Sequence, residues 1–288
     1  MGYTGAEFQF VTIHTGTAMA SNGYITNLLK GNYQPDFLIA AGAGLIAGVS
    51  VVGAVGHASA LTTATVYDCY GNAATVPLYP YLAAASTIAL SSSSANDTAI
   101  AGSGARVVFV TGLDANYNPV SETVALNGVT PVNTVNAYLR INNAYVVVSG
   151  SFGNTNAGNI SLVANSNSAN LGIIRTGIGR VANAVYTVPT GFVAVVASIS
   201  ANISGGPSFT AQVGRADNSN TLVAQTGAMN TGAVFNLTGA GPFEEAIPGN
   251  VVLPQRTDIS LRIPAVGQAA TAVDGVIHIV NIASSYLA

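Results

Sequence analysis

The sequence predicts an all-β fold made of antiparallel β-sandwich or jelly-roll-like domains, with an irregular N-terminal region. Two observations carry this prediction. Short segments in which apolar and polar residues alternate recur along the chain, and clusters of Ser, Asn and Gly separate them. Such clusters bond their own backbone and end a strand, so their spacing is typical of a sandwich. No repeat of about 20 to 50 residues is evident, which sets solenoids and propellers aside.

Residues 1–84 are expected to be irregular and to act as an anchor or arm. This region mixes short apolar runs with tyrosines and prolines, a texture that suits neither a long helix nor a regular sheet. One short helix is predicted at residues 24–30, where Ser21 or Asn22 can serve as the N-terminal cap.

Residues 85–182 form the first predicted sandwich domain. Polar clusters such as SSSSAND and GSFGNTNAGN separate its strand-like segments. These clusters compete with the sheet for backbone hydrogen bonds and therefore end each strand. The predicted strands are 87–90, 106–111, 122–126, 137–141, 144–149 and 159–164.

Residues 183–288 form the second predicted sandwich domain, which is jelly-roll-like. In residues 197–204 (ASISANIS) the apolar side chains share one face and the polar ones share the other, the pattern of a half-buried strand. Residues 276–282 are apolar on both faces, which predicts a central strand. The segment DISLRI (258–263) alternates as well, with its apolar residues predicted to face the core. The residues predicted to face the solvent are Asp258, Ser260 and Arg262.

The segment GLDANYNPVSETVALNG (112–128) raises a choice between a cation-binding loop and a turn that starts a strand. Asp114, Asn116 and Asn118 have the spacing of the first three oxygen ligands of an EF-hand loop. Pro119 replaces the glycine that such a loop needs at its bend, and an alanine stands where the closing glutamate belongs. Asn, Asp, Gly and Pro are also the residues that form turns. We therefore predict a turn between two strands and no calcium site.

The composition favours a protein that assembles. Charged residues make up 7% of the 288 residues, against about 25% in ordinary soluble domains. Lys30 is the only lysine, and the other cations are arginines. Arginine is enriched at protein interfaces and lysine is depleted there. The chain is therefore suited to packing against copies of itself or against a neighbour, although drift in a β protein rich in small residues would give a similar composition.

Two partner classes are not supported by the composition. The net charge of −3 and the lack of clustered cations leave no electrostatic footprint for a direct nucleic-acid partner. Cys69 is the only cysteine, so neither an intrachain disulfide nor a thiolate metal cluster can form.

The apolar segment at residues 37–55 matches two other patterns. It carries no charge and is long enough to cross a membrane, but it contains several glycines, and each costs about 1 kcal/mol in a helix. We expect a buried strand or irregular core segment there and no membrane partner. Within it, GAGLIA (42–47) fits the G-x-G-x-x-A fingerprint of dinucleotide sites. The segment that follows has no polar face and no βαβ unit, so no cofactor is expected.

No motif for catalysis or metal binding is evident. The three histidines, His14, His57 and His278, are far apart in sequence, so a triad or zinc site would need tertiary proximity. Glu244 and Glu245 are the only adjacent acidic pair, and we expect them in a solvated loop. The chain has no Trp to form a sugar platform. We expect no enzyme, no catalytic residue, no metal and no cofactor.

The stretch SSSSANDTAIAGSGARVVFVTGLDANYNPVSETVALNGVTPVNT, followed by AYLRINNAYVVVSG and NAGNISL, resembles a family of virion structural proteins of tailed bacteriophages. The segments AVYTVPTGFVAVVASISANIS and VVLPQRTDISLRI resemble the C-terminal β-domain of that family. The resemblance covers about residues 86–282. Its most specific parts, SANDT, GLDANYN and SETVALNG, are turn and strand signatures. The resemblance implies a non-enzymatic particle component: a capsid decoration protein, a head fibre or a tail part.

Composition and resemblance together favour a capsid decoration (cement) protein on the virion surface that stabilises the head shell through many weak contacts. The expected partners are the major capsid protein and the chain itself, as a symmetric homo-oligomer with a trimer as the first expectation. Aromatic residues dominate interface hot spots, which guides the choice of contact residues in the N-terminal region. The candidate capsid or neighbour contacts are Phe8, Phe10, Tyr33, Phe37, Tyr79 and Tyr81.

Two other functions stay open. A tail, receptor-binding or head-fibre component of the virion would share the fold. A secreted sugar-binding or hydrolytic β-sandwich is the third choice, and it should show a cleft where carboxylates converge.

Overall fold

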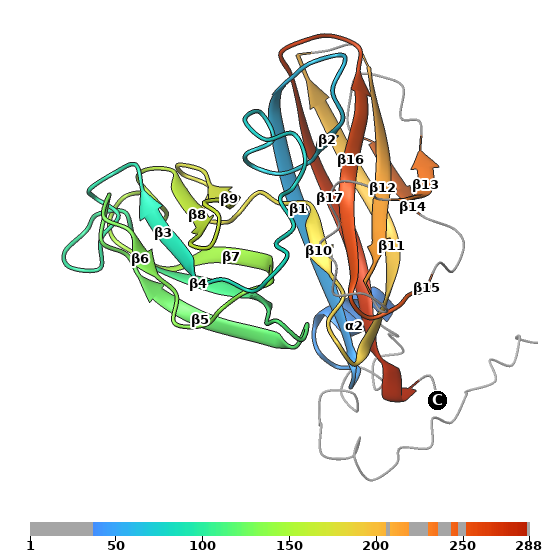
Figure 1. The fold of residues 1–288 in the computed structure, drawn as a ribbon, viewed down its shortest axis with the longest axis horizontal. Coiled ribbons are helices and arrows are strands. Elements are labelled where there is room, and N and C mark those ends of the chain that lie inside the picture. Colours follow the sequence, from blue (N-terminus) through green and yellow to red (C-terminus); the bar gives the residue numbers. More distant parts are fainter. Residues whose placement is uncertain (1–36, 206–207, 219–229, 236–242, 247–251, 287–288) are drawn as a thin grey trace, which may run out of the picture. The chain divides into compact units, whose positions relative to one another are not determined.

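The computed structural model confirms the predicted all-β sandwich class. Apart from one short α-helix and one 3-10 turn, the regular elements it describes are β-strands in antiparallel sheets (Figure 1). Two compact units are present, residues 1–47 and residues 48–288. In the first unit the described element is α2 (Phe37–Gly42). The residues that the structure describes are 37–205, 208–218, 230–235, 243–246 and 252–286.

The large sandwich consists of two five-stranded sheets within residues 48–288. In the first sheet β17 lies between β1 and β11, and β14 and β15 both pair with β11. In the second sheet β16 lies between β10 and β12, β13 pairs with β12, and β2 pairs with β16. The first sheet contains β1 (Val49–Leu61), β11 (Phe192–Ser204), β14 (Phe243–Ala246), β15 (Val252–Leu253) and β17 (Thr271–Ala283). The second contains β2 (Tyr67–Asp68), β10 (Val185–Thr187), β12 (Phe209–Asp217), β13 (Asn230–Phe235) and β16 (Thr257–Val266). A 3-10 turn, η1 (Ser284–Tyr286), follows β17.

The small sandwich combines a four-stranded sheet, in the order β6-β3-β8-β9, with a three-stranded sheet, in the order β5-β4-β7. The first of these sheets contains β3 (Ile88–Ser92), β6 (Val132–Asn133), β8 (Ile160–Ala164) and β9 (Asn170–Ile174). The second contains β4 (Ala105–Leu113), β5 (Pro119–Ala125) and β7 (Arg140–Ser149).

The core of the small sandwich follows from strict alternation along its strands. In β3 and β8 every second residue is buried, so Ile88, Leu90 and Leu162 point inward. Val108 and Val110 of β4 are completely buried as well. Burying each such side chain contributes about 1.5 to 3 kcal/mol, which makes this apolar layer the main source of stability.

The large sandwich confirms the central strand predicted at residues 276–282, because β17 pairs with β1 on one side and with β11 on the other. Its first sheet also corrects the expected irregularity of residues 1–84. There, β1 is a long strand that pairs with β17, with one irregularity between Ala58 and Leu61. Its core-facing residues include Ala54, Gly56 and Ala58, which give a weak hydrophobic signal in the sequence. A side chain at Gly56 would collide with the backbone of Cys69 and Ala184, so the small residues allow close packing.

The segment at residues 37–55 contains α2 and the start of β1. A strand was expected and is found at residues 49–55, but residues 37–42 form a short helix in which Ile39 is exposed, which corrects the expectation of a buried segment there. No helix among the described residues is long and apolar enough to cross a membrane. The helix predicted at residues 24–30 lies outside the described residues.

Two predicted strands, 137–141 and 144–149, are joined in the single strand β7. The two asparagines between them continue the strand because Asn142 bonds the backbone of Thr187 instead of its own. Residues 48–288 form one compact unit, so separate domains divided between residues 182 and 183 stay a prediction. Strands β1 and β2, from the region expected to be an arm, belong to the large sandwich.

Candidate functional site

The segment GLDANYN forms a turn, as predicted. One oxygen of the Asp114 carboxylate accepts hydrogen bonds from the backbone N–H groups of Asn116 and Asn118, at 2.8 and 2.9 Å. The turn joins β4 to β5, and its Tyr117 adopts a left-handed backbone with φ of 63°. Asp and Asn stabilise such turns by bonding the backbone two residues on, so the side-chain pattern serves the turn.

A second aspartate, in the SANDT signature, holds several loops of the small sandwich together. Asp97 is completely buried. It accepts backbone hydrogen bonds from Ala105, Ala157 and Gly158 at 2.7 to 2.8 Å, and a fourth bond from the hydroxyl of Ser92 at 2.6 Å. These five residues are called the Asp97 cluster below. Four donors thus satisfy the hydrogen-bonding capacity of this buried side chain.

The loops of the Asp97 cluster are packed too closely for ordinary side chains. A Cβ atom on Gly104 would collide with the Asp97 carboxylate and would lie 2.8 Å from the backbone of Ala157. Glycine is therefore required at this position because the loops approach each other backbone to backbone.

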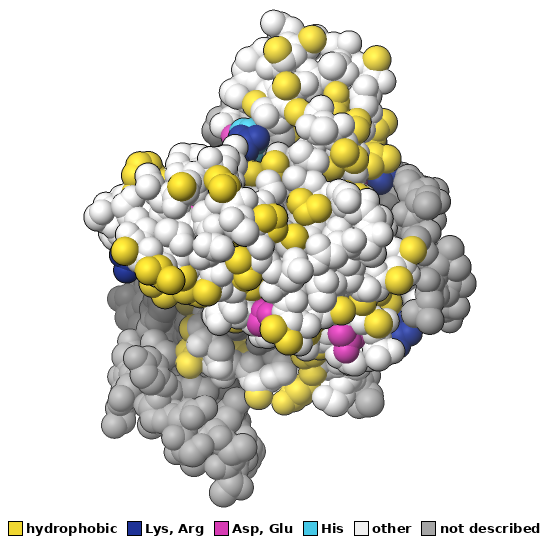
Figure 2. All heavy atoms as spheres, turned by 60° about the vertical axis from the view of Figure 1, so that its left-hand side comes forward, with side chains coloured by type: hydrophobic (Ala, Val, Ile, Leu, Met, Phe, Trp, Pro, Cys, Tyr) yellow, Lys and Arg dark blue, Asp and Glu magenta, His cyan; other side chains and the backbone are white. Residues whose placement is uncertain are grey.

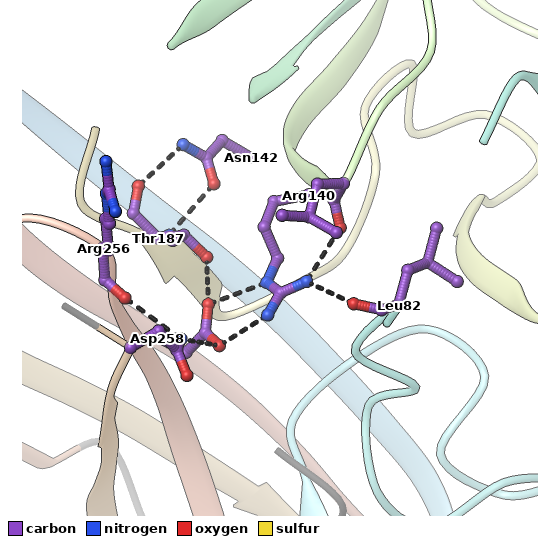
Figure 3. Close-up of polar contacts among 8 residues, drawn as sticks. Leu82, Arg140, Asn142, Thr187, Arg256 and Asp258 are labelled. Carbon is purple, nitrogen blue, oxygen red and sulfur yellow. Dashed lines mark hydrogen bonds and ion pairs between the residues drawn. The ribbon is translucent and has the colours of Figure 1, made fainter. Parts of the chain in front are cut away.

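A buried ion pair joins β7 to β16, which are far apart in sequence (Figure 3). Arg140 Nε donates to Asp258 Oδ1 at 2.8 Å, and Arg140 Nη2 donates to Asp258 Oδ2 at 2.9 Å. Arg140 Nη1 donates to the carbonyls of Leu82 and Leu139, both at 2.9 Å. The two side chains are 2% and 0% exposed. Because the pair is bidentate and its remaining donors are bonded, the cost of burying two charges is largely offset.

Neutral residues complete the bonding of the buried carboxylate. Thr187 Oγ1 donates to Asp258 Oδ1 at 2.6 Å, and Asn218 Nδ2 donates to Asp258 Oδ2 at 2.7 Å. The guanidinium of Arg140 also lies over two aromatic rings, 5.0 Å from the centre of Tyr81 and 5.7 Å from that of Tyr117. The guanidinium of Arg256 also lies over the Tyr117 ring, 5.7 Å from its centre. The Arg140 cluster is the set Arg140, Asp258, Thr187, Asn218, Tyr81 and Tyr117.

A second buried ion pair joins Asp68 to Arg262, which follows Asp258 by four residues in β16. Arg262 Nε and Ser260 Oγ both donate to Asp68 Oδ1 at 2.9 Å, and the backbone N–H of Tyr79 donates to Asp68 Oδ2 at 2.9 Å. This pair fixes β2 and the segment after it against β16.

The two pairs correct the prediction for DISLRI. Ile259, Leu261 and Ile263 are buried as expected. The opposite face is buried too, because the Arg140 cluster and the Asp68 pair cover it. The residues predicted to face the solvent, and found buried, are Asp258, Ser260 and Arg262.

The electrostatics of the Arg140 cluster follow from burial. Burial by itself lowers the pKa of Arg140, but the Asp258 carboxylate more than offsets this, and the pKa lies above its ordinary value. Burial raises the pKa of the Tyr81 hydroxyl well above its usual range, and it also raises the pKa of Tyr79. Arg140 therefore stays charged and the tyrosines stay neutral at physiological pH, which suits a permanent structural tie.

The structure separates the histidines that it describes. His57 Nδ1 lies 2.5 Å from Asp274 Oδ1, across β1 and β17. His278 Nδ1 lies 2.9 Å from Ser198 Oγ, across β17 and β11. Each of these two histidines thus contacts a side chain of a neighbouring strand. Among the described residues no group of three or more His, Cys, Asp or Glu side chains could hold a metal ion. His14 lies outside the described residues.

The structure also places two other sequence patterns, the adjacent glutamates and the GAGLIA segment. Glu244 and Glu245, expected in a loop, lie in β14 and pair with β11. The fingerprint GAGLIA (42–47) follows a helix and precedes a strand, the reverse of the strand–turn–helix order that a dinucleotide site requires.

The predicted contact residues fall into two groups. Phe8, Phe10 and Tyr33 lie outside the described residues, and Phe37 lies in α2. Tyr79 is buried, and its ring packs edge-on against the rings of Tyr70 and Tyr81. The Tyr81 ring lies beneath Arg140. Tyr79 and Tyr81 are therefore part of the chain's own core, which corrects their placement in an outward-facing anchor.

Burial of the three aspartates Asp68, Asp97 and Asp258 was not predicted from the sequence. One signal was available: in a chain with so few charges, a charged residue inside an apolar strand, as in AYLRINN, needs a buried partner. The partner of Arg140 could not be predicted from the sequence, because Asp258 is 118 residues away.

The surface of the small sandwich is nearly free of charge. Figure 2 shows this face as mostly uncharged polar side chains and backbone, with scattered apolar side chains and few charged ones. Large apolar side chains that are exposed in this region are Ile100, Val129, Val135, Tyr145, Val147, Val148, Phe152 and Ile178.

No family model and no curated protein matches this chain. Among solved structures, it is similar to three of infectious bursal disease virus. The structure of the Gt strain is 13% identical, with 91% of this chain and 78% of that chain covered and a TM-score of 0.23. A mutant VP2 protein in derived T=1 particles is 17% identical, with 91% and 75% covered and a TM-score of 0.20. A VP2 subviral particle is 14% identical, with 91% and 78% covered and a TM-score of 0.17. Similarity at this level carries no argument about function.

Proposed function

We propose that this chain is a structural component of a bacteriophage virion, and that it decorates the capsid as a non-enzymatic cement protein. The proposal rests on the structural role of the aspartates in the signature segments. Asp97 of SANDT and Asp114 of GLDANYN both accept hydrogen bonds from backbone N–H groups of other residues in the small sandwich. The segments that resemble phage virion proteins therefore build the scaffold, as expected of a particle component.

The surface supports assembly. A decoration protein binds its shell through many weak contacts, and an uncharged surface has little desolvation cost when it is covered. The small sandwich supplies such a surface, with the few charges and the exposed apolar side chains described above (Figure 2). The major capsid protein and further copies of the chain are the proposed partners.

The proposed anchor is the N-terminal region. Its aromatic residues Phe8, Phe10, Tyr33 and Phe37 are the proposed capsid contacts, since Tyr79 and Tyr81 serve the chain's own core. Deleting residues 1–34 should abolish capsid binding while the β-sheet signal in circular dichroism stays unchanged. Unchanged capsid binding would rule the anchor out.

Immunogold electron microscopy of intact particles tests the function directly, with an antibody raised against the purified chain. Gold spread over the heads supports decoration. Gold at single vertices indicates a head fibre, and gold on the tails indicates a tail component. Particles without label would contradict a virion role and return attention to a sugar-binding or hydrolytic sandwich.

One observation favours a receptor-binding virion component as the second candidate. Phe109 and Tyr145 lie on the outer face of the three-stranded sheet, with ring centres 5.4 Å apart, and Tyr145 is 38% exposed. Exposed aromatic side chains are enriched at binding surfaces, because their rings bury a large apolar area. In a cell-binding assay, Tyr145→Ala should abolish binding if this candidate is correct, and Val147→Ala is the matched control. Absence of binding by the wild-type chain would remove this candidate.

A further inference from the structure

Strand β1 lies at the edge of the first sheet of the large sandwich. It pairs with β17 and with no other strand among the described residues (Figure 1). An edge strand leaves one row of backbone N–H and C=O groups without ladder partners, and such a row can bind another strand. Whether another strand can bind depends on which backbone N–H and C=O groups of β1 point away from β17 and on what covers them.

Hydrogen bonds at both ends of β1 show the direction of its backbone groups. The carbonyl of Gly48 accepts a bond from Ala283 N at 2.7 Å, so the even-numbered residues point toward β17. His57 N donates to the carbonyl of Ala182, and the carbonyl of Gly53 accepts a bond from Arg180 Nη2, so the odd-numbered residues point away. This alternation is the geometry of an antiparallel ladder.

The outward row is covered at one end and open at the other. At His57 the covering segment is residues 180–182. No hydrogen bond among the described residues occupies the outward backbone groups of Val49, Val51 and Val55. The open part of the edge is therefore residues 49–55.

The open part lacks the devices that normally protect an edge. Its sequence, VSVVGAV, contains no charge and no proline. The irregularity in the β1–β17 register lies between Ala58 and Leu61, at the covered end. Charged residues, prolines and bulges are the usual means by which edge strands avoid pairing. Among the described residues, the Arg180 side chain bonds to this part of the edge, at the Gly53 carbonyl.

We propose that residues 49–55 of β1 pair with the same residues of a second copy of this chain, antiparallel and about a two-fold axis. The first sheets of two large sandwiches then form one continuous sheet. Two identical edges are always complementary when they run antiparallel, and this contact is closed by its own symmetry.

A second copy fits this edge better than a charged partner does. Residues 49–55 carry no charge of their own, and Arg180 at the Gly53 carbonyl is the charged side chain described at this edge. The two strands themselves therefore meet without repulsion, whereas like charges opposite each other destabilise a ladder. With the axis at residue 52, Val49 faces the partner's Val55 and Val52 faces the partner's Val52, and β-branched cross-strand pairs are favourable in sheets. Ser50, Gly53 and Ala54 are small and permit close approach. Two-fold pairing builds dimers and even-numbered assemblies in place of the trimer expected from the sequence.

This inference deepens the self-association included in the proposed function and rests on that part of it. The experiments below use the purified full chain without capsids. A failure of the pairing therefore leaves the location on the particle to be decided by the gold label, and a failure of the label leaves the pairing intact.

Proline at an outward position tests the backbone contact. Val51→Pro removes an N–H group that makes no bond to β17, so the sandwich should fold. Sedimentation equilibrium should give an even multiple of the chain mass for the wild type and for the conservative control Val51→Thr. Val51→Pro and Val51→Lys should halve the mass. Monomeric wild type would overturn the proposal, as would an unchanged mass for Val51→Lys, which decides the matter if Val51→Pro does not fold.

Cysteine substitution tests the symmetry. Cys69 is buried and is the only native cysteine, so it does not compete. Gly53 has room for a side chain, since the nearest atom to a Cβ there would be 3.8 Å away. Val51→Cys, Gly53→Cys and the double variant cover axes at residues 51, 52 and 53. At least one should form a disulfide-linked dimer under oxidation. A dimer without any such disulfide would mean that β1 meets a different surface, and it would overturn the pairing of β1 with β1.

Discussion

Asp97 and Asp258 are both completely buried and each accepts four hydrogen bonds, but their donors differ. Asp97 takes three backbone N–H groups and a hydroxyl, all from one sandwich. Asp258 takes a bidentate guanidinium and two neutral side chains that come from distant parts of the chain. Backbone donors hold loops in place, whereas a cation on a long side chain joins strands that are far apart in sequence.

The kind of donor also determines which buried group is left without a partner after a substitution. Removing Arg140 leaves a buried negative charge without its cation, the most expensive kind of defect. Removing the Asp97 carboxylate leaves neutral N–H groups without an acceptor, which costs less per group but disturbs several loops at once. The predictions below test this contrast from the largest expected effect to the smallest.

Arg140→Ala should lower the free energy of unfolding by about 3 to 5 kcal/mol, because Asp258 stays buried without its counter-charge. Urea denaturation followed by circular dichroism measures this. Arg106→Ala is the matched control, since the Arg106 side chain is partly exposed and makes one hydrogen bond, to the Gly102 carbonyl. It should cost no more than about 1 kcal/mol.

A double substitution separates charge from packing in the Arg140 cluster. Arg140→Met combined with Asp258→Leu should recover most of the stability lost in Arg140→Ala, because an apolar pair of similar volume replaces buried charges at little net cost. If the double variant is as unstable as Arg140→Ala, the unpaired charge is not the cause.

Asp97→Asn should lower the free energy of unfolding by about 2 to 3 kcal/mol, since an amide presents N–H groups to donors that need an acceptor. Hydrogen exchange should quicken at the amides of Ala105, Ala157 and Gly158, with β16 and β17 unchanged. Equal acceleration in β16 and β17 would show that the Asp97 cluster is not a local device.

Alkaline pH should weaken the large sandwich through its buried tyrosines. Burial raises the pKa of Tyr186 to about 12, against about 10 in the unfolded chain. The unfolded state therefore loses this proton first. The stabilisation is complete below pH 10 and falls between about pH 10 and 12, by roughly 1.4 kcal/mol per pH unit. Unfolding measured at pH 9, 10 and 11 should show a slope smaller by one proton in Tyr186→Phe, with Tyr286→Phe as the exposed control. Equal slopes would contradict this assignment.

Asp114→Ala should have the smallest effect, about 1 kcal/mol, because its hydrogen bonds are exposed to water. The turn also places Tyr117 beside Arg140, so part of the loss should be shared with that cluster. A double-mutant cycle with Tyr117→Leu measures the coupling. Additive effects would show that the turn and the cluster are independent.

The sequence predicts elements best where packing is one-sided and regular. Strands β3, β4 and β8 alternate clearly and lie within a few residues of the predicted segments. The turn at Asp114 was predicted because turn residues act through local hydrogen bonds. These signals are local, and local signals are readable without knowing the fold.

The predictions failed where the partner is distant. Strand β1 has alanine and glycine on its core face, so its burial depends on close backbone approach to Cys69 and Ala184. The polar face of DISLRI was assigned to solvent because alternation alone cannot show that a second layer covers it. Asp258 became a core residue only through Arg140, whose position the pattern of either strand does not give.

The order of strands in the first sheet has a consequence for biosynthesis. Residues 57 and 274, which face each other across β1 and β17, are 217 positions apart, and β17 is the strand that joins β1 to β11. During translation the small sandwich can fold once residues 88–174 have been made, because its strands pair with one another. Strand β1 stays unpaired until β17, near the end of the chain, has been synthesised. Contacts of such long range slow folding. The uncharged edge of β1 is then exposed on the ribosome for most of synthesis, which makes this strand the segment where nascent chains would first associate or need a chaperone.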